Sequence, residues 1–185
     1  MKKYTLRKDE TIVRDGRTLY RIQALRKIIP GVEKGTLGGY VEGEKNLSQQ
    51  GNGWIFEEAC AYEGARVEGN AILFDQTTLR GKAKLMEGAI LLDQAIVQGE
   101  AKVGGRSRVH DQVVVGGKAE VKGWIALEDA VHVGGNACLE GDRKHYLFLK
   151  GTTMILGDTV IHGAGNFAQE EAILDGGIFT IGEEV

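Results

Sequence analysis

The sequence predicts an all-β fold, a parallel β-helix solenoid built from six-residue units, and three observations lead to that fold class. Aliphatic residues recur at every sixth position from Ile55 to Leu139. Small residues recur four positions after each aliphatic one, and Gly, Asp or Glu recur two positions after it. The 185 residues include 28 Gly and a single Pro, which is typical of many tight corners between hydrogen-bonded strands. An amphipathic helix is excluded, because its apolar positions repeat about every 3.6 residues.

The aliphatic series predicts the inward side of short strands. Its fifteen members are Ile55, Ala61, Val67, Leu73, Leu79, Leu85, Leu91, Val97, Val103, Val109, Val115, Val121, Leu127, Val133 and Leu139. Each small residue precedes the next aliphatic one by two positions, so both point to the same face of a strand. These two series therefore predict a narrow core with aliphatic columns and small residues at its crowded corners.

The third series predicts the corners themselves. All fifteen of its members are Gly, Asp or Glu, and Gly and Asp tolerate the left-handed region of the backbone. Each hexapeptide is then a short strand followed by a corner, and three hexapeptides close one triangular coil. Successive coils stack as parallel strands ~4.8 Å apart, and the length of the repeat predicts about seven coils.

The repeat breaks after Leu139 and resumes in a new phase. The second aliphatic run is Leu149, Ile155, Ile161, Phe167, Ile173 and Phe179, with corners expected at Gly151, Gly157, Gly163, Gln169, Asp175 and Ile181. Extra residues separate the two runs, which predicts an inserted, protruding loop near 141–148.

Residues 1–34 do not follow the repeat and predict an N-terminal β-hairpin. Two β-rich runs flank Arg14, Asp15 and Gly16, a favourable turn sequence. The end of a solenoid exposes unpaired backbone and apolar core, so we expect the hairpin to cap it. Residues 35–54 then form a lead-in segment and first partial coil, and residues 55–185 form the hexapeptide-repeat β-helix.

These residues resemble the left-handed parallel β-helix proteins with hexapeptide repeats. The segments Gly35–Val41, Asn46–Gln49, Gly51–Asn52 and Trp54–Ile55 look closest to the YdcK-like branch, whose members are labelled acyltransferases and are also met among phage-encoded proteins. The resemblance covers about residues 35–180. It implies a left-handed coil, threefold assembly and, for an acyltransferase, a His general base in a cleft between subunits. Gly mostly stands one position later here than in the best-known hexapeptide pattern, which weakens transfer from characterised acyltransferases.

The composition excludes several classes of partner. A net charge of −3 supplies no strong field for nucleic acid, and no apolar run is long enough to cross a membrane. The N-terminus lacks the apolar stretch of a secretion signal, so we expect a cytoplasmic protein. Cys60 and Cys138 form no CxxC motif and are expected to be free thiols, and no His or Cys spacing indicates a metal site.

An apolar stripe is predicted on the outside of the first face of the prism. Its six members stack over three successive coils: Trp54, Phe56, Ile72, Phe74, Ile90 and Leu92. An exposed stripe of this size indicates a covering partner. Two interpretations remain open at this stage. Either the N-terminal hairpin folds back over the stripe, or the stripe is a subunit interface, threefold as the resemblance implies.

Two groups of residues are candidates for chemistry. His110 lies below the stripe beside Arg108, and Glu128 is one coil further along the same ladder, so a His–carboxylate pair there would suit a general base. The alternative is that these residues only solvate a strand surface. The second group would bind a phosphate-bearing anion and combines Arg108 with four residues of the inserted loop: Arg143, Lys144, His145 and Tyr146. A merely solvated loop is the alternative there.

The preferred hypothesis for function is a trimeric binding or scaffold protein with a small-molecule or protein ligand, without nucleic acid, membrane or cofactor. The first alternative is an acyltransferase that uses acyl-CoA as cosubstrate, with His110 as base. The second alternative follows from the phage likeness, and is a phage-encoded binder of a small ligand or host protein.

Overall fold

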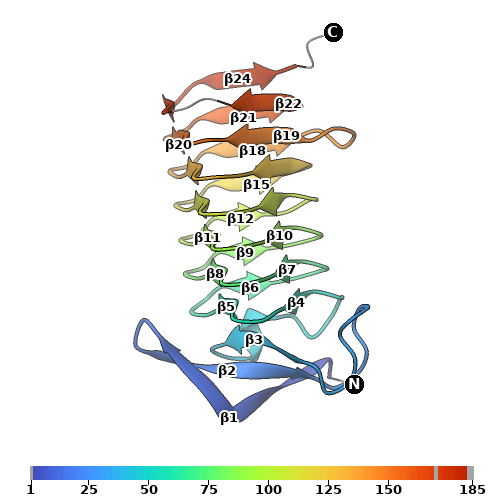
Figure 1. Ribbon diagram of the computed structural model, residues 1–185. Coiled ribbons are helices and arrows are strands. Elements are labelled where there is room, and N and C mark those ends of the chain that lie inside the picture. Colours follow the sequence, from blue (N-terminus) through green and yellow to red (C-terminus); the bar gives the residue numbers. More distant parts are fainter. Residues whose placement is uncertain (1, 169–170, 183–185) are drawn as a thin grey trace.

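The structure is a computed structural model that describes residues 2–168 and 171–182, and it is a column of stacked β-coils (Figure 1). Three sheets run along the column, and within the coils all strands pair in parallel. The sequence prediction of an all-β parallel solenoid is confirmed. The hand of the coil stays a prediction from the resemblance.

The first sheet, called sheet A, has ten strands. They are β1 (Tyr4–Arg14), β2 (Arg17–Ala24), β3 (Leu37–Val41), β5 (Cys60–Ala61), β8 (Thr78–Leu79), β11 (Ile96–Val97), β14 (Val114–Val115), β17 (His132–Val133), β20 (Met154–Leu156) and β23 (Ile173–Asp175). The other two sheets have seven strands each.

Sheet B contains β6 (Arg66–Val67), β9 (Lys84–Leu85), β12 (Lys102–Val103), β15 (Glu120–Lys122), β18 (Cys138–Gly141), β21 (Val160–Gly163) and β24 (Ile178–Ile181). Sheet C contains β4 (Trp54–Ile55), β7 (Ile72–Leu73), β10 (Ile90–Leu91), β13 (Arg108–Val109), β16 (Ile125–Leu127), β19 (Leu147–Lys150) and β22 (Gly165–Ala168). A single 3-10 turn, η1 (Glu44–Asn46), is the helical element of the described chain.

The core is built from the two inward series that the sequence predicts. Every aliphatic member from Ile55 to Leu139 is buried, and so is every small member from Ala59 to Ala137. Thr77 and Ser107 belong to the small series, and each hydroxyl bonds to a backbone carbonyl. The pairing register advances by one coil at a time, as in Leu73 with Leu91 and Leu91 with Val109. The predicted six-residue repeat therefore corresponds to one side of a coil, and 18 residues make one full coil.

The predicted corners are also present. Of the fifteen corner positions between Glu57 and Gly141, all but Gly141 have positive φ, and Gly141 instead ends strand β18. Gly123 shows why Gly is needed at several of them, because a Cβ there would overlap the backbone of Gly141 in the next coil. At such corners the backbones of two successive coils are in direct contact and leave no room for a side chain.

The solenoid has about eight turns rather than the seven predicted. The additional turn is irregular and uses the lead-in segment, where β3 pairs in parallel with β5 and Leu47 makes a bridge to Val67. The hexapeptide spacing does not hold before Ile55, so the count of hexapeptides did not include this turn, although residues 35–54 were expected to form a first partial coil.

The predicted register is wrong near the C-terminal end of the described chain. Ile173, expected inside, is 68% exposed, and Leu174 lies opposite the buried Ile155 in its place. The reason is a slip, because Met154 pairs with Ile173, 19 residues later, where earlier coils advance by 18. Asp175 consequently lies within a strand rather than at a corner. Gly163 and Ile181 also lie within strands, because β21 and β24 extend over four residues and pair with each other up to these positions. The predicted corner at Gln169 lies outside the described residues.

The N-terminal hairpin, β1 and β2, continues sheet A below the first coil (Figure 1). Tyr4, Ile22 and Val32 are buried in the same apolar cluster as the first coils. This segment therefore closes the core at the N-terminal end of the column.

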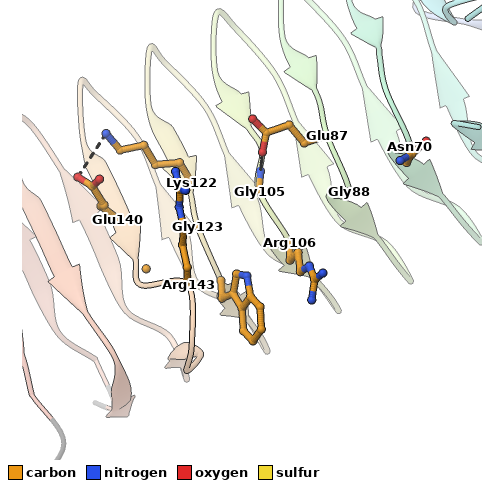
Figure 2. A pocket seen from close by; sticks show the side chains of 11 residues that line it. Asn70, Glu87, Gly88, Gly105, Arg106, Lys122, Gly123, Glu140 and Arg143 are labelled. Carbon is orange, nitrogen blue, oxygen red and sulfur yellow. Dashed lines mark hydrogen bonds and ion pairs between the residues drawn. The ribbon is translucent and has the colours of Figure 1, made fainter. Parts of the chain in front are cut away.

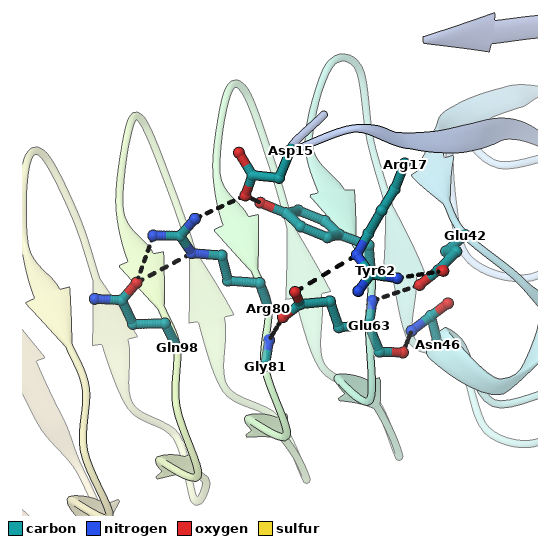
Figure 3. A network of polar contacts seen from close by, with 9 residues as sticks. All are labelled: Asp15, Arg17, Glu42, Asn46, Tyr62, Glu63, Arg80, Gly81 and Gln98. Carbon is teal, nitrogen blue, oxygen red and sulfur yellow. Dashed lines mark hydrogen bonds and ion pairs between the residues drawn. The ribbon is translucent and has the colours of Figure 1, made fainter. Parts of the chain in front are cut away.

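The tip of the hairpin lies against the outer side of sheet A (Figure 3). Tyr62 Oη and Arg80 Nη1 both donate to Asp15 Oδ2 at 2.8 Å. Leu19 and Ile12 pack on a small apolar cluster with Cys60 and Tyr62. The tip of the hairpin thus covers sheet A, whereas the start of β1 reaches the first member of the stripe on sheet C, where Tyr4 contacts Trp54.

Candidate functional site

The predicted inserted loop connects β18 to β19 and protrudes from the column (Figure 1). It spans 142–146, shorter than predicted, because Gly141 and Leu147 belong to the flanking strands. Asp142 Oδ1 accepts the N–H groups of Lys144 and His145 at 2.6 and 2.7 Å, which fixes the loop as an Asx turn. These N–H groups hold the pKa of the Asp142 carboxyl below its ordinary value.

A groove of about 790 Å³, called the corner groove, lies beside this loop along the corner between sheets B and C (Figure 2). Its walls come from consecutive coils, so each coil contributes a residue or two. The lining residues are Asn70, Glu87, Gly88, Gly105, Arg106, Lys122, Gly123, Trp124, Glu140, Gly141 and Arg143. Glycines at the corner keep the floor of the groove low.

Some charged side chains of the corner groove have a partner in the chain, and others have none among the described residues. Lys122 Nζ forms an ion pair with Glu140 at 3.3 Å, and Glu87 Oε2 accepts the N–H of Gly105 at 2.6 Å. In contrast, neither Arg106 nor Arg143 has a carboxylate partner among residues 2–168 and 171–182, and both are exposed. The groove therefore presents two guanidinium groups that are available to an anion.

Aromatic rings border these cations. The guanidinium of Arg106 lies 4.9 Å from the centre of the Trp124 ring, and that of Arg108 lies 5.8 Å from the centre of the Tyr146 ring. The Trp124 and Tyr146 rings are 5.5 Å apart, and Tyr146 Oη donates to the carbonyl of Arg106 at 3.1 Å. The loop is thereby fastened to the solenoid through Tyr146, and the half-buried indole keeps one side toward the groove.

The structure gathers only part of the predicted ligand site. Arg143 lines the corner groove, while Arg108 and Tyr146 contact each other beside it. Lys144 and His145 lie in the loop outside the groove lining.

Sequence reasoning missed Arg106 and Trp124. Both directly follow a corner glycine and lie outside the strands, whereas the search for candidate residues followed the strand faces and the inserted loop. The coil spacing held the signal, since one column of the prism contains Asn70, Gly88, Arg106 and Trp124.

His110 and Glu128 occupy neighbouring positions in the sheet C ladder, as the spacing predicts, because the N–H of His110 donates to the carbonyl of Leu127. The Glu128 carboxylate is bound at 2.7 Å by Lys150 Nζ, which raises the pKa of Lys150. Within the described chain, the His110 imidazole has no hydrogen bond or ion pair. The Glu128 carboxylate, which was expected to make His110 a better base, is thus paired with Lys150 instead.

The apolar stripe on sheet C divides into two parts. Trp54, expected to point outward, is fully buried, with Tyr4 edge-on at 6.4 Å and Gly38 packed against it. Trp54 pairs in register with the partly exposed Ile72, so it belongs to the outward ladder, and the N-terminal segment covers it, as one of the two interpretations expected. The other five members are partly exposed: Phe56, Ile72, Phe74, Ile90 and Leu92. Phe56 and Phe74 stack with ring centres 4.2 Å apart.

Three further features bound the chemistry. Cys60 and Cys138 are free thiols, and burial raises the pKa of both. Among the described residues, no group of three or more His, Cys, Asp or Glu side chains is arranged to hold a metal ion. The same residues include no helix long and apolar enough to span a membrane.

Comparison with protein-family models and with curated proteins finds no match to this chain. The site must therefore be interpreted from its own geometry.

Proposed function

We propose that this chain is a β-solenoid binding protein that holds a small anionic ligand in the corner groove. One observation carries the proposal. Arg106 and Arg143 line the groove without a carboxylate partner in the described chain, although Lys122 beside them is paired with Glu140. A guanidinium group offers several N–H donors in a plane and binds phosphate or carboxylate through two of them.

The size and position of the groove support the same function. Its volume of about 790 Å³ falls in the range of small-molecule sites, roughly 300–1,000 Å³. The loop that carries Arg143 adds four residues to the hexapeptide spacing, and such loops on rigid scaffolds commonly carry binding residues.

Assembly as a homotrimer in the cytoplasm belongs to the proposal. The five partly exposed members of the stripe form a continuous apolar column, since Ile72 pairs with Ile90 in register. Solvent contact of such a column is unfavourable, and the hairpin leaves it uncovered. Threefold packing of sheet C faces is the arrangement that the resemblance implies.

Titration with inorganic tripolyphosphate by calorimetry tests the binding function. We expect saturable binding at low salt that weakens as salt is added, because the contacts are ionic. Arg106→Gln and Arg143→Gln should each lower the affinity about tenfold or more, which corresponds to ~1.4 kcal/mol per lost contact. Arg14→Gln is the matched control, since Arg14 is exposed at the hairpin and remote in sequence from the groove. Equal binding by all three variants would contradict the proposal.

The acyltransferase remains the second candidate, from the YdcK-like resemblance and from a partly exposed His110 on sheet C. It predicts acyl-CoA turnover that His110→Ala abolishes without loss of fold. Absence of any acyl-CoA binding would exclude it. If the phage likeness holds, the same groove serves as the binding site for a ligand from the host.

A further inference from the structure

We infer that the ligand of the corner groove is a nucleotide, that is, a phosphorylated compound with a planar heteroaromatic ring. This inference rests on the proposed anion-binding function and adds the ring. Two arginines alone would suit any phosphate, but the groove also places an aromatic surface between them.

The order of the residues along the column carries the argument. Arg106 donates its N–H to the carbonyl of Gly123, and Trp124 donates its N–H to the carbonyl of Asp142. Trp124 therefore lies one coil beyond Arg106 and one coil before the loop with Arg143. Adjacent coils are ~4.8 Å apart, so Trp124 stands between the coil of Arg106 and the loop of Arg143, and the Arg106 guanidinium lies 4.9 Å from the centre of its ring. A ring that stacks on Trp124 would bring its phosphate groups within reach of Arg106 or Arg143.

The aromatic surface is held in place before any ligand arrives. Tyr146 fixes its hydroxyl on the backbone of Arg106 and its ring beside Trp124, while Arg106 lies over the indole. Bases stack on aromatic rings and on guanidinium planes alike, and such stacking tolerates different bases. The side chains that would contact the ring thus already have their positions.

The surrounding charges favour a single nucleotide over a nucleic acid strand. Glu87 and Glu140 line the groove, and Asp142 belongs to the adjacent loop. Further along sheet B, Lys82 and Lys102 are neutralised by Glu100 and Glu120 at 3.1 and 2.6 Å. A bound strand needs a continuous cationic track for its backbone, and the described surface beside the groove offers paired charges.

The test compares ATP with inorganic tripolyphosphate, which carries similar charge and no ring. The chain has two Trp, and Trp54 is buried away from the groove, so fluorescence of a Trp54→Phe variant reports on Trp124. We expect ATP to quench this fluorescence and to bind at least tenfold more tightly than tripolyphosphate. Calorimetry on the unsubstituted chain provides the affinities without any substitution.

A second substitution separates the ring from the anion. Trp124→Leu should reduce ATP affinity to that of tripolyphosphate and leave tripolyphosphate binding unchanged, while Trp124→Phe should restore much of the difference. Tyr20→Leu on the hairpin is the matched control for loss of a partly exposed aromatic residue.

The outcomes distinguish the inference from the function on which it rests. If ATP binds no better than tripolyphosphate, the nucleotide inference is overturned and anion binding stands. If neither binds, both are overturned. If a 12-residue oligoadenylate binds more tightly than ATP at equal site concentration, the ligand is single-stranded RNA, and the inference is again overturned.

Discussion

Corner carboxylates show at the residue scale how this column tolerates strained backbone. Asp75, Asp93, Asp111 and Asp129 all have φ between 53° and 63°, which is unfavourable for residues other than Gly. Each accepts through Oδ2 the backbone N–H of the corner one coil further on, at 2.9–3.2 Å. The hydrogen bond to an ionised acceptor offsets the cost of the left-handed conformation. Asp at these corners therefore links coils as well as turning the chain.

Lys3 is the residue with the clearest pH dependence. It is fully buried, and its Nζ donates to the carbonyl of Gly53 at 2.9 Å. Burial, together with repulsion from Arg26, lowers its pKa from 10.5 to about 8. Below pH 8 both folded and unfolded chains carry the proton, and the folded state bears the whole cost of burying the charge. Between pH 8 and 10.5 the folded state releases the proton first, so the Lys3 contribution to the free energy of unfolding rises with pH.

We predict that this contribution appears as a difference between the natural chain and Lys3→Met. The free energy of unfolding of the natural chain, relative to that of the variant, should rise by about 2 kcal/mol between pH 7 and 10. Urea unfolding at a series of pH values measures it. Other groups titrate identically in both proteins and cancel. A difference that is constant with pH would show that Lys3 titrates normally.

The sequence predicts the residues of the core well and those of the site less well, for a physical reason. Leu73 or Ala83 is buried by coils that repeat its own pattern, so periodicity alone locates it. Trp54 is buried by Tyr4 and Gly38, which belong to no repeat, and its position could not follow from spacing. Arg143 could be proposed from the composition of the loop. The sequence does not show that the nearby Glu140 forms its ion pair with Lys122, which leaves Arg143 without this carboxylate.

At the scale of elements, the hairpin is attached to the column at two places. Its base is buried with the first coil through Tyr4 and Ile22. Its tip depends on Asp15, which binds Tyr62 and Arg80, and on Arg17, which binds Glu42 at 2.8 Å (Figure 3). The contacts at the turn itself are polar and partly exposed, whereas Leu19 and Ile12 just behind it pack on Cys60 and Tyr62, so the turn is the weakest part of the attachment.

We predict that Asp15→Ala releases the tip and leaves the coils intact. Hydrogen exchange should become faster at the ends of β1 and β2 near the turn, with unchanged protection in β8 to β14. Asp9→Ala is the control, because Asp9 pairs with Arg7 inside the same strand. The hydrogen bonds from Tyr62 and Arg80 lower the pKa of Asp15. Its contribution is therefore present above an unfolded pKa of about 3.8 and is lost as the pH falls through the lower folded value. Equal exchange in both variants would contradict this role.

The hairpin illustrates what element-level prediction from sequence can reach. The turn at Asp15–Gly16 and its flanking strands were predictable from local residue types, and both are present. The face on which the hairpin folds was not predictable, because it depends on long-range partners such as Tyr62 and Arg80. The β18–β19 loop follows the same rule, since its existence was visible in the spacing and its contacts with Trp124 were not.

At the scale of the whole molecule, the partly exposed stripe on sheet C is the proposed subunit interface. Phe74 stacks on Phe56 and keeps part of its surface in solvent within one chain. We predict that Phe74→Glu converts an assembly of three times 20.0 kDa into a single chain, since a carboxylate is costly to bury in an apolar interface.

Sedimentation equilibrium measures the mass, and circular dichroism checks that the variant stays folded. Val13→Glu is the control, because Val13 is an exposed apolar residue on the hairpin, 64% accessible. A single-chain mass for the unsubstituted protein, or an unchanged mass for Phe74→Glu, would refute the trimer.

The four extra residues between β18 and β19, at the corner between sheets B and C, have a consequence for how such a protein can change over generations. Asp129 still accepts the N–H of the next corner, although that corner is now Gly151, 22 residues away, and Ile125 still pairs with Leu147. The surplus residues all leave the column at one place, and every neighbouring ladder continues in register. A change in the length or composition of that loop is therefore expected to leave the strand pairing of the solenoid almost unchanged. The loop beside the groove can therefore change in sequence without disturbing the spacing on which the solenoid depends.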